Sequence, residues 1–242
     1  MVQPTTMGRP PTIGSVQLSA GTPRVVAAGG EAELDALTQA AGADIVELRA
    51  DLFDDPRPET ITAALARLRS AGRPIILTVR AASEGGRPLD EARRHALYAR
   101  GLPLVDAIDV EIASDALVAE VVPRARATGR TLLLSAHAFD AMPSEEALRA
   151  TIARAAGLGA DLTKIAAVAH DVDELQRLLV VTLGARDRHL VTLAMGPMGP
   201  LSRLVLPAAG SLLTYGHVGR PTAPGQLGVG ELAAELRRLY PS

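Results

Sequence analysis

TLLLSAHAFDAMPSEEALRATIARAAGLGADLTKIA, residues 131–166, contains two short apolar runs separated by an amphipathic stretch. The runs at 131–136 and 161–166 are rich in leucine and β-branched residues, which is typical of strands. The stretch at 145–158 repeats apolar residues at helical spacing and ends at a glycine. The segment therefore predicts a strand–helix–strand unit, in which the crossover helix makes the two strands parallel.

The same alternation continues in both directions along the chain. Short connections join the units, and eight of them in 242 residues predict an α/β fold, a (β/α)8 TIM barrel. An open doubly wound sheet is the alternative, but its G-x-G-x-x-G fingerprint does not follow the first strand. Further strands are expected at 24–28, 44–49, 74–80, 105–112, 189–195 and 211–215, and further helices at 31–41, 58–71 and 171–183.

The ends of the chain define the expected domain organisation. Residues 12–242 are expected to form a single (β/α)8 domain, and residues 1–11 a flexible tail. Within the domain, TIGSVQLSAG at 12–21 is expected to add a short strand or hairpin that closes the bottom of the barrel.

Composition narrows the class of partner. The net charge is −2 without blocks of like charge, and aromatic residues make up 2%, so we expect no nucleic-acid partner. No apolar run approaches the roughly 18 residues of a membrane span, and the first residues lack the apolar region of a signal peptide. The chain has no cysteine, which excludes disulfides and thiolate chemistry. We therefore expect a cytoplasmic protein without a membrane partner.

One basic residue differs from all the others. Among 25 lysine and arginine residues, only Lys164 is a lysine, and it lies inside the apolar run DLTKIA. A lysine amine can lose its proton and attack carbon, whereas a guanidinium stays charged. A solvated strand end is the alternative explanation. We interpret Lys164 as a nucleophile that forms an imine with a carbonyl compound.

Ionisable residues follow the expected strands. Because TIM-barrel active sites lie at the carboxyl ends of the strands, these side chains are expected to meet there. Glu47 and Arg49 share one face of their strand with Asp51, and a buried structural ion pair between Glu47 and Arg49 is an equal alternative. The group comprises Glu47, Arg49, Arg80, Glu84, Asp109, Glu111, His137, Lys164 and Arg203.

A carbanion beside an imine needs a base, and histidine is suited to that task at neutral pH. His137 directly follows a predicted strand, which makes it the first candidate. His217, in a predicted loop after the last strand, ranks second. No pair of histidines has metal-ligand spacing, so we expect no metal.

Six ordered motifs identify a family resemblance. The chain resembles type I 3-dehydroquinate dehydratase, the Schiff-base-forming barrel enzyme of the shikimate pathway. The resemblance covers nearly the whole chain from about residue 24 onward. It rests on VELRADLF (46–53), PIILTVRAASEGG (74–86), LLLSAHAFDAMPS (132–144), GADLTKIA (159–166), AMGPMGPLSR (194–203) and TYGHVGRPTAPGQL (214–227).

The resemblance implies dehydration of the small-molecule substrate 3-dehydroquinate by syn elimination, without a cofactor, in a homodimer. It assigns the imine to Lys164 and acid–base catalysis to His137, oriented by Glu84, with Asp109 similarly placed. Arg203 resembles the residue that holds the substrate carboxylate. The remaining implied substrate contacts are Glu47, Arg49 and Arg80 on the ring hydroxyls, and Thr222 and Gln226 on a loop that covers the substrate.

The chain departs from the family pattern without losing a proposed catalytic group. Thr222 replaces a usual serine, Ala138 a common aspartate, Leu193 a frequent methionine and Tyr215 a familiar phenylalanine. Two alternative functions stay open at this point. One is a class I Schiff-base aldolase of a sugar phosphate, although two prolines in GPMGP (196–200) remove backbone donors for a phosphate. The other is a non-catalytic binding barrel.

Overall fold

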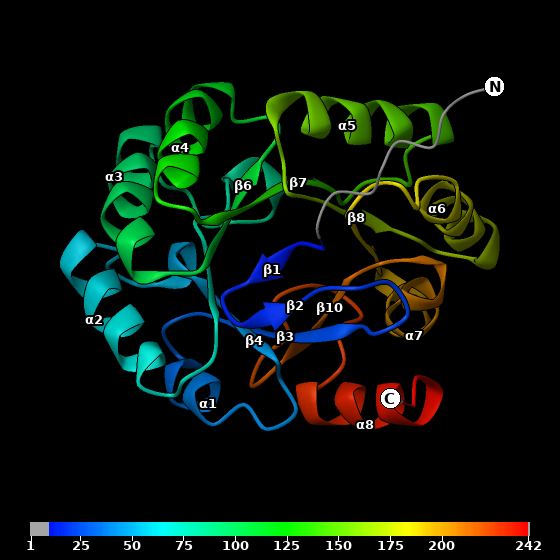
Figure 1. Ribbon diagram of the computed structural model, residues 1–242, viewed down its shortest axis with the longest axis horizontal. Helices are drawn as coiled ribbons and strands as arrows, with labels where there is room; N and C mark the ends of the chain where they lie inside the picture. The colour runs from blue at the N-terminus through cyan, green and yellow to red at the C-terminus, as the bar shows by residue number, and fades with distance from the viewer. Residues whose placement is uncertain (1–9, 242) are drawn as a thin grey trace.

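A computed structural model describes residues 10–241, and within them a parallel eight-stranded sheet curls into a nearly closed barrel surrounded by helices (Figure 1). Neighbouring strands follow the order β10-β3-β4-β5-β6-β7-β8-β9. The strands are β3 (Arg24–Gly29), β4 (Ile45–Arg49), β5 (Ile75–Thr78), β6 (Ala107–Glu111), β7 (Thr131–Ala138), β8 (Leu162–Val168), β9 (Leu190–Met195) and β10 (Leu213–His217). The TIM-barrel prediction is confirmed.

The helices alternate with the strands. They are α1 (Leu34–Thr38), α2 (Pro58–Arg69), α3 (Glu91–Gly101), α4 (Asp115–Ala127), α5 (Glu145–Leu158), α6 (Val172–Gly184), α7 (Gly199–Ala209) and α8 (Val229–Leu239). Helix α5 has the bounds expected from the sequence, because the Ser144 side chain accepts the amide of Ala147 at its start and Gly159 ends it in the left-handed conformation. Helix α1 is much shorter than the expected 31–41. Residues 31–33 form a turn instead of the first helical residues, and in this turn the Glu33 carboxylate accepts the amide of Gly30.

The barrel has one seam. Strands β9 and β10 are the ends of the hydrogen-bonded order and form no ladder with each other. Single bonds cross the seam instead: the amide of Leu212 donates to the carbonyl of Leu190 at 2.9 Å, and the amide of Thr192 donates to the Ser211 hydroxyl at 2.9 Å.

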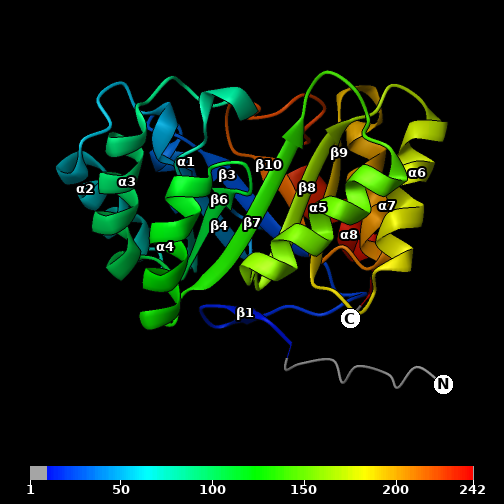
Figure 2. The ribbon, with the colours of Figure 1, turned by 90° about the horizontal axis from the view of Figure 1, so that it is seen from above.

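A hairpin of β1 (Thr12–Ile13) and β2 (Val16–Gln17) lies below the barrel, at the amino-terminal ends of the strands (Figure 2). Ile13 and Leu18 are fully buried in one apolar cluster with interior strand residues. The expected hairpin at the bottom is confirmed. We give the name floor to the part of this cluster at the amino-terminal end, which comprises Ile13, Leu18, Ile45, Ile76, Ala107, Leu133, Leu162 and Leu213.

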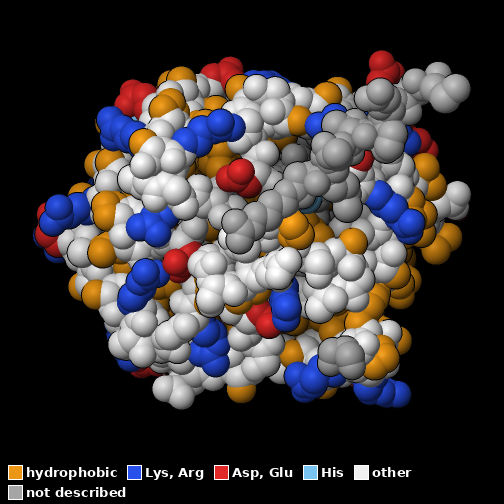
Figure 3. Space-filling view, viewed as in Figure 1, with side chains coloured by type: hydrophobic (Ala, Val, Ile, Leu, Met, Phe, Trp, Pro, Cys, Tyr) orange, Lys and Arg blue, Asp and Glu red, His pale blue; other side chains and the backbone are white. Residues whose placement is uncertain are grey.

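The prediction of a tail over residues 1–11 falls mostly outside the described residues. Within them, the carbonyl of Pro11 accepts the amide of Leu18 at 2.9 Å, which ties this residue to the hairpin. On the face that carries the hairpin, basic and acidic side chains are interspersed around the rim (Figure 3). In the described part of the chain, no helix is long and apolar enough to cross a membrane.

Candidate active site

On six strands, the side chains that face the inside of the barrel change from apolar to polar at the same level. Side chains two residues apart on a strand face the same way, about 7 Å further along. Each floor residue of a strand is followed, two positions toward the carboxyl end, by a side chain that can form hydrogen bonds. These six buried side chains, which we call the polar step, are Glu47, Thr78, Asp109, Ser135, Lys164 and Tyr215.

Lys164 occupies the centre of this polar step with an exposed fraction of only 4%. Its Nζ donates to Asp109 Oδ2 at 2.8 Å and to Glu47 Oε2 at 3.4 Å. The same Nζ lies 4.1 Å from the centre of the Tyr215 ring, a distance typical of a cation–π contact. Two carboxylates and an aromatic face thus surround the amine, which has to pass a proton to a base before it can attack carbon.

Arg80 follows β5 and organises the carboxylates beside the lysine. Its guanidinium contacts Asp109 Oδ2 at 3.0 Å, Glu111 Oε1 at 2.9 Å and Ser135 Oγ at 2.7 Å. Burial by itself raises the pKa of Asp109, but Arg80 and then Lys164 hold it well below its ordinary value. Asp109 is therefore an ionised carboxylate shared by both cations.

Arg94 extends this network to the helix layer. From α3 it pairs with Glu111 and donates through Nε to the carbonyl of Val79 at 3.0 Å. Arg80 is therefore held by Glu111, which is in turn held by Arg94, and the whole group is buried. Fixed in this way, the guanidinium of Arg80 has little freedom to move when a ligand enters.

His137 and Glu84 form a second ionisable pair across the cavity. His137 lies in β7 and Glu84 in the 3-10 turn Ala82–Glu84. Oε2 of Glu84 lies 2.8 Å from Nδ1 of His137 and accepts the backbone amide of the same histidine at 2.9 Å. With Glu84 ionised, the ring donates through Nδ1 and leaves Nε2 as the basic nitrogen.

The pKa values of this pair are both displaced. Burial lowers the pKa of His137 well below its ordinary value, and Arg80 and Lys164 act in the same direction. Burial also raises the pKa of Glu84 to about 7, against the opposing effect of Arg80 and with a further rise from Glu111. The imidazole is therefore neutral and able to accept a proton.

Arg203 is a buried cation without an anionic partner among the described residues. Lying in α7, it donates to the carbonyls of Tyr215 at 3.0 Å, Ala194 at 3.0 Å and Gly199 at 2.7 Å. Burial lowers its pKa to about 10, so the guanidinium is still charged at neutral pH. A buried charge without a counter-ion is costly, so an anionic ligand that bound beside Arg203 would offset this cost.

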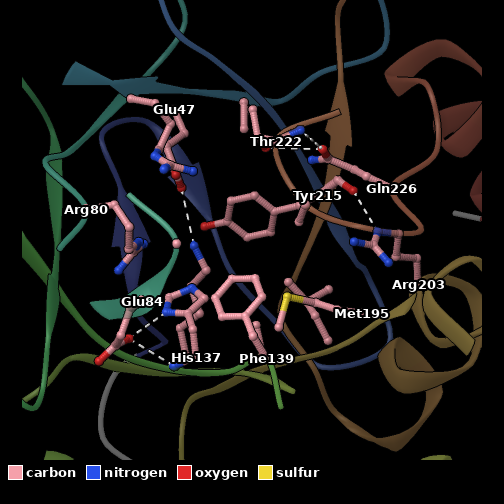
Figure 4. Close-up of a pocket in the computed structure, with 17 residues that line it drawn as sticks. Glu47, Arg80, Glu84, His137, Phe139, Met195, Arg203, Tyr215, Thr222 and Gln226 are labelled. Carbon is pink, nitrogen blue, oxygen red and sulfur yellow. Dashed lines mark hydrogen bonds and ion pairs between the residues drawn. The ribbon is translucent and has the colours of Figure 1, made fainter. Parts of the chain in front are cut away.

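The segment between β10 and α8 covers one side of the cavity (Figure 4). Oε1 of Gln226 accepts the amide of Thr222 at 2.8 Å and its hydroxyl at 3.1 Å. Gly225 has φ +71°, and a Cβ there would lie 2.3 Å from the carbonyl oxygen of Gly196. The segment therefore rests directly on the turn after β9, and only glycine permits that approach.

One cavity is lined by the nine side chains to which the family resemblance gives a catalytic or substrate-binding role, whereas Asp109 and Glu111 are not among its lining residues. The nine are Glu47, Arg49, Arg80, Glu84, His137, Lys164, Arg203, Thr222 and Gln226. Glu47 and Arg49 do not pair with each other. Glu47 contacts Lys164, whereas Arg49 binds Asp51 through Nε at 2.9 Å and Nη2 at 2.7 Å. His217, the second-rank histidine, is not among the lining residues. Within residues 10–241, no group of three or more histidine, cysteine or acidic side chains could hold a metal ion.

With this geometry established, comparison with known proteins identifies the family. The model of the type I 3-dehydroquinase family matches residues 25–241. The chain belongs to this family.

Relatives named 3-dehydroquinate dehydratase support the assignment. The 3-dehydroquinate dehydratase of Methanocella arvoryzae is 38% identical over 201 residues, which cover 83% of this chain and 89% of the relative. That of Klebsiella pneumoniae strain 342 is 36% identical over 205 residues, 79% and 81% of the two chains. A crystal structure of the type I enzyme from Clostridium difficile, with covalently modified comenic acid, has a TM-score of 0.89 at 30% identity and covers 97% and 99%.

Several contacts of this type I 3-dehydroquinase site were missed by sequence reasoning. Ser135 and Arg94 complete the network of Arg80, and Phe139 stacks on His137 with ring centres 6.5 Å apart. The two-residue spacing from Leu133 to Ser135 would have placed Ser135 inside the barrel. Arg94 gave no such signal, since an arginine on an amphipathic helix is usually solvated.

Proposed function

We propose that the chain dehydrates 3-dehydroquinate to 3-dehydroshikimate by syn elimination, through an imine on Lys164. The observation that carries this proposal is the position of the only lysine. Its amine is buried in a cavity that also holds a neutral histidine and a buried, unpaired arginine. These are a nucleophile, a base and an anion site within one pocket.

The first step forms the imine. The ammonium of Lys164 gives up a proton, the free amine attacks the ring ketone, and the addition product loses water. In balance, one ammonium and one ketone give one protonated imine and one water, so the positive charge stays on the nitrogen. Asp109 and Glu47 face this charge before and after the step.

His137 then removes a proton from the carbon beside the imine. The protonated imine accepts the electron pair of the broken C–H bond, which lowers the cost of the carbanion. The protonated His137 next gives its proton to the departing hydroxyl, which leaves as water. Glu84 keeps Nδ1 of the imidazole engaged, so that Nε2 performs both transfers. Hydrolysis of the product imine restores the lysine.

Arg203 is the proposed partner of the substrate carboxylate, because a planar guanidinium binds a carboxylate with two parallel hydrogen bonds. Glu47, Arg49 and Arg80 contact the ring hydroxyls, and the segment with Thr222 and Gln226 covers the ligand.

The substitution Arg203→Lys keeps the positive charge but loses the two parallel donors of the guanidinium. We expect about 10- to 100-fold weaker binding of a carboxylate-bearing product analogue, measured by calorimetry; unchanged affinity would place the carboxylate elsewhere, next to Arg49 or Arg80.

The decisive experiment combines turnover with trapping. Purified protein is mixed with 3-dehydroquinate and borohydride, and peptide mass analysis locates the reduced adduct. We expect it on Lys164, together with formation of 3-dehydroshikimate. Lys164→Arg, which retains charge and approximate length, should form no adduct and no product. Full activity of this variant would rule out the imine.

The same trapping experiment addresses the aldolase alternative. A sugar-phosphate aldolase would also form an adduct on Lys164, but it would cleave a carbon–carbon bond instead of releasing water. The family match favours dehydration. A product that lacks carbon atoms of the substrate would overturn this assignment.

The proposal includes a cytoplasmic homodimer. Apolar side chains exposed on the outer helices, Val172 and Leu183 on α6 and Leu201 on α7, are suited to a subunit contact. Sedimentation at micromolar concentration tests the assembly: a species of one chain's mass, 25.2 kDa, would contradict it.

A further inference from the structure

The hydroxyl of Tyr215 is a buried polar group that the mechanism above does not use. Tyr215 is 4% exposed and lines the cavity, and its hydroxyl points toward the side where Glu47 and Arg80 lie (Figure 4). It makes no hydrogen bond of normal geometry with any described residue. Other buried polar atoms lack a partner too, but among the described residues only this one lines the cavity. A buried hydroxyl left unpaired is costly, so its presence calls for a partner that arrives later.

The chemistry of Lys164 changes the number of donors beside Tyr215. The lysine ammonium carries three N–H bonds, and two of them are directed at Asp109 and Glu47. When the ammonium and a ketone become a protonated imine and water, two of the three hydrogens leave with the oxygen. The imine nitrogen keeps its positive charge but only one N–H. One of the two carboxylates therefore loses its hydrogen bond at this step.

The geometry identifies Glu47 as the carboxylate that loses its donor. Asp109 is nearer to Nζ, at 2.8 Å against 3.4 Å, and it also accepts from Ser135 at 2.6 Å and pairs with Arg80 at 3.0 Å. Lys164 makes the one hydrogen bond of normal geometry to the Glu47 side chain among the described residues, and the Tyr215 hydroxyl already lies close enough to Glu47 for their contact to raise the pKa of the phenol. Once the imine forms, Glu47 has lost its donor within the chain, and only a ring hydroxyl of the substrate or another side chain can replace it.

We propose that Tyr215 is a positioning residue whose hydroxyl becomes the donor to Glu47 when Lys164 is converted to the imine. Its ring remains beneath the cationic nitrogen throughout, while its hydroxyl takes over the hydrogen bond that the ammonium gives up. The inference rests on the proposed imine function and adds to it a residue that stabilises the covalent intermediate.

The state of the phenol is suited to this role. Burial raises the pKa of Tyr215 well above its ordinary value, and the charges of Glu47 and Asp109 raise it further. The hydroxyl therefore keeps its proton at neutral pH and can only donate to a carboxylate. Glu47 is the carboxylate with the larger effect on it.

The test compares Tyr215→Phe with the wild-type chain on two ketones. One is 3-dehydroquinate, and the other is 3-oxocyclohexane-1-carboxylate, which keeps the ring, ketone and carboxylate but has no hydroxyl. The rate of borohydride trapping is measured against ketone concentration by intact mass. We expect Tyr215→Phe to lower the saturating rate about tenfold for both ketones, the loss of one hydrogen bond to a charged group.

A second measurement separates this role from a structural one. Cyclohexanecarboxylate has no ketone and leaves the ammonium intact, so it should bind Tyr215→Phe and wild type equally. The melting temperature should not fall, because the hydroxyl makes no hydrogen bond of normal geometry in the free chain. Thr78→Val is the matched control: it removes another buried, unpaired hydroxyl of the same polar step that does not line the cavity, and it should trap both ketones like wild type.

Three results would overturn the inference. Equal trapping by Tyr215→Phe and wild type would show that the hydroxyl has no role in the imine. A loss confined to 3-dehydroquinate would show that Tyr215 binds a ring hydroxyl instead of Glu47. A wild-type chain that traps 3-dehydroquinate but not the bare keto acid would show that Glu47 needs ring hydroxyls as donors. Failure of the proposed function is distinct, since wild type would then trap neither ketone.

Discussion

At the residue scale, the proposed mechanism divides the chemistry between Lys164 as the nucleophile and His137 as the base. The lysine contacts Asp109 and Glu47, whereas the histidine contacts Glu84 on another side of the cavity. The two groups therefore have separate supporting residues. This separation allows bond formation and proton transfer to be tested independently.

His137→Ala should keep the covalent step and lose the proton transfer. We expect a fall of about 10²- to 10⁴-fold in kcat, the usual contribution of a general base. Borohydride should still trap 3-dehydroquinate on Lys164, as seen by intact mass. His170→Ala, at an exposed histidine, serves as the control. Absence of adduct in a folded His137→Ala chain would mean that His137 also forms the imine.

Glu84 gives the reaction a pH dependence. Because burial raises its pKa to about 7, the ionised form that accepts from Nδ1 of His137 is lost as the pH falls through 7. We expect kcat/KM to decrease about tenfold per pH unit below this value and to level off above it. In Glu84→Gln this limb should disappear, and a profile unchanged by the substitution would assign the titration to another group.

At the element scale, the positions of the strands could be predicted from the sequence, whereas the ion pairs of their side chains could be predicted only in part. Each of the eight expected strands overlaps a strand of the barrel, since apolar runs at regular spacing leave few alternatives. Because side chains two residues apart on a strand face the same way, the buried Leu162 indicates that Lys164 also faces the inside of the barrel. The pairing of Arg49 with Asp51, in place of Glu47, depends on the turn that follows β4, and strand periodicity carries no information about a turn.

The segment between β10 and α8 should control ligand release. Gln226→Ala removes the acceptor of two bonds from Thr222, so the segment should open more readily. We expect about tenfold faster dissociation of a product analogue, measured by stopped flow, because each bond contributes about 1 kcal/mol. Arg220→Ala, exposed on the same segment, should dissociate like wild type. Equal rates in the two variants would show that the Gln226 bonds do not hold the cover closed.

At the scale of the whole molecule, the two ends of the barrel have different tasks. The amino-terminal end is an apolar floor sealed by the hairpin that lies below the strands (Figure 2), and the carboxyl end carries the ionisable residues. The sequence predicted the hairpin at the bottom, and it predicted the ionisable residues at the carboxyl ends of the strands because TIM-barrel active sites lie there. It could not give the seam between β9 and β10, which depends on how the sheet closes.

Ile13→Ala should separate stability from catalysis. The side chain is fully buried in the floor, and its truncation leaves a cavity that costs about 2–4 kcal/mol. Denaturant unfolding should show this loss, while kcat/KM changes by less than about twofold because the polar step lies a further 7 Å along the strands. A fall in kcat/KM comparable to the loss of stability would show that the floor and the site are coupled.

The floor also determines the route of water. In the proposed mechanism, imine formation expels the ketone oxygen as water, and hydrolysis of the product imine takes up a water molecule again. With the amino-terminal end sealed by Ile13 and Leu18, exchange with bulk solvent passes through the covered mouth, so the expelled molecule is available for reuse. A substrate labelled with oxygen-18 in its ketone should therefore keep part of the label after a single turnover, and Gln226→Ala should keep less. Complete exchange in the wild-type chain would show that this water equilibrates freely.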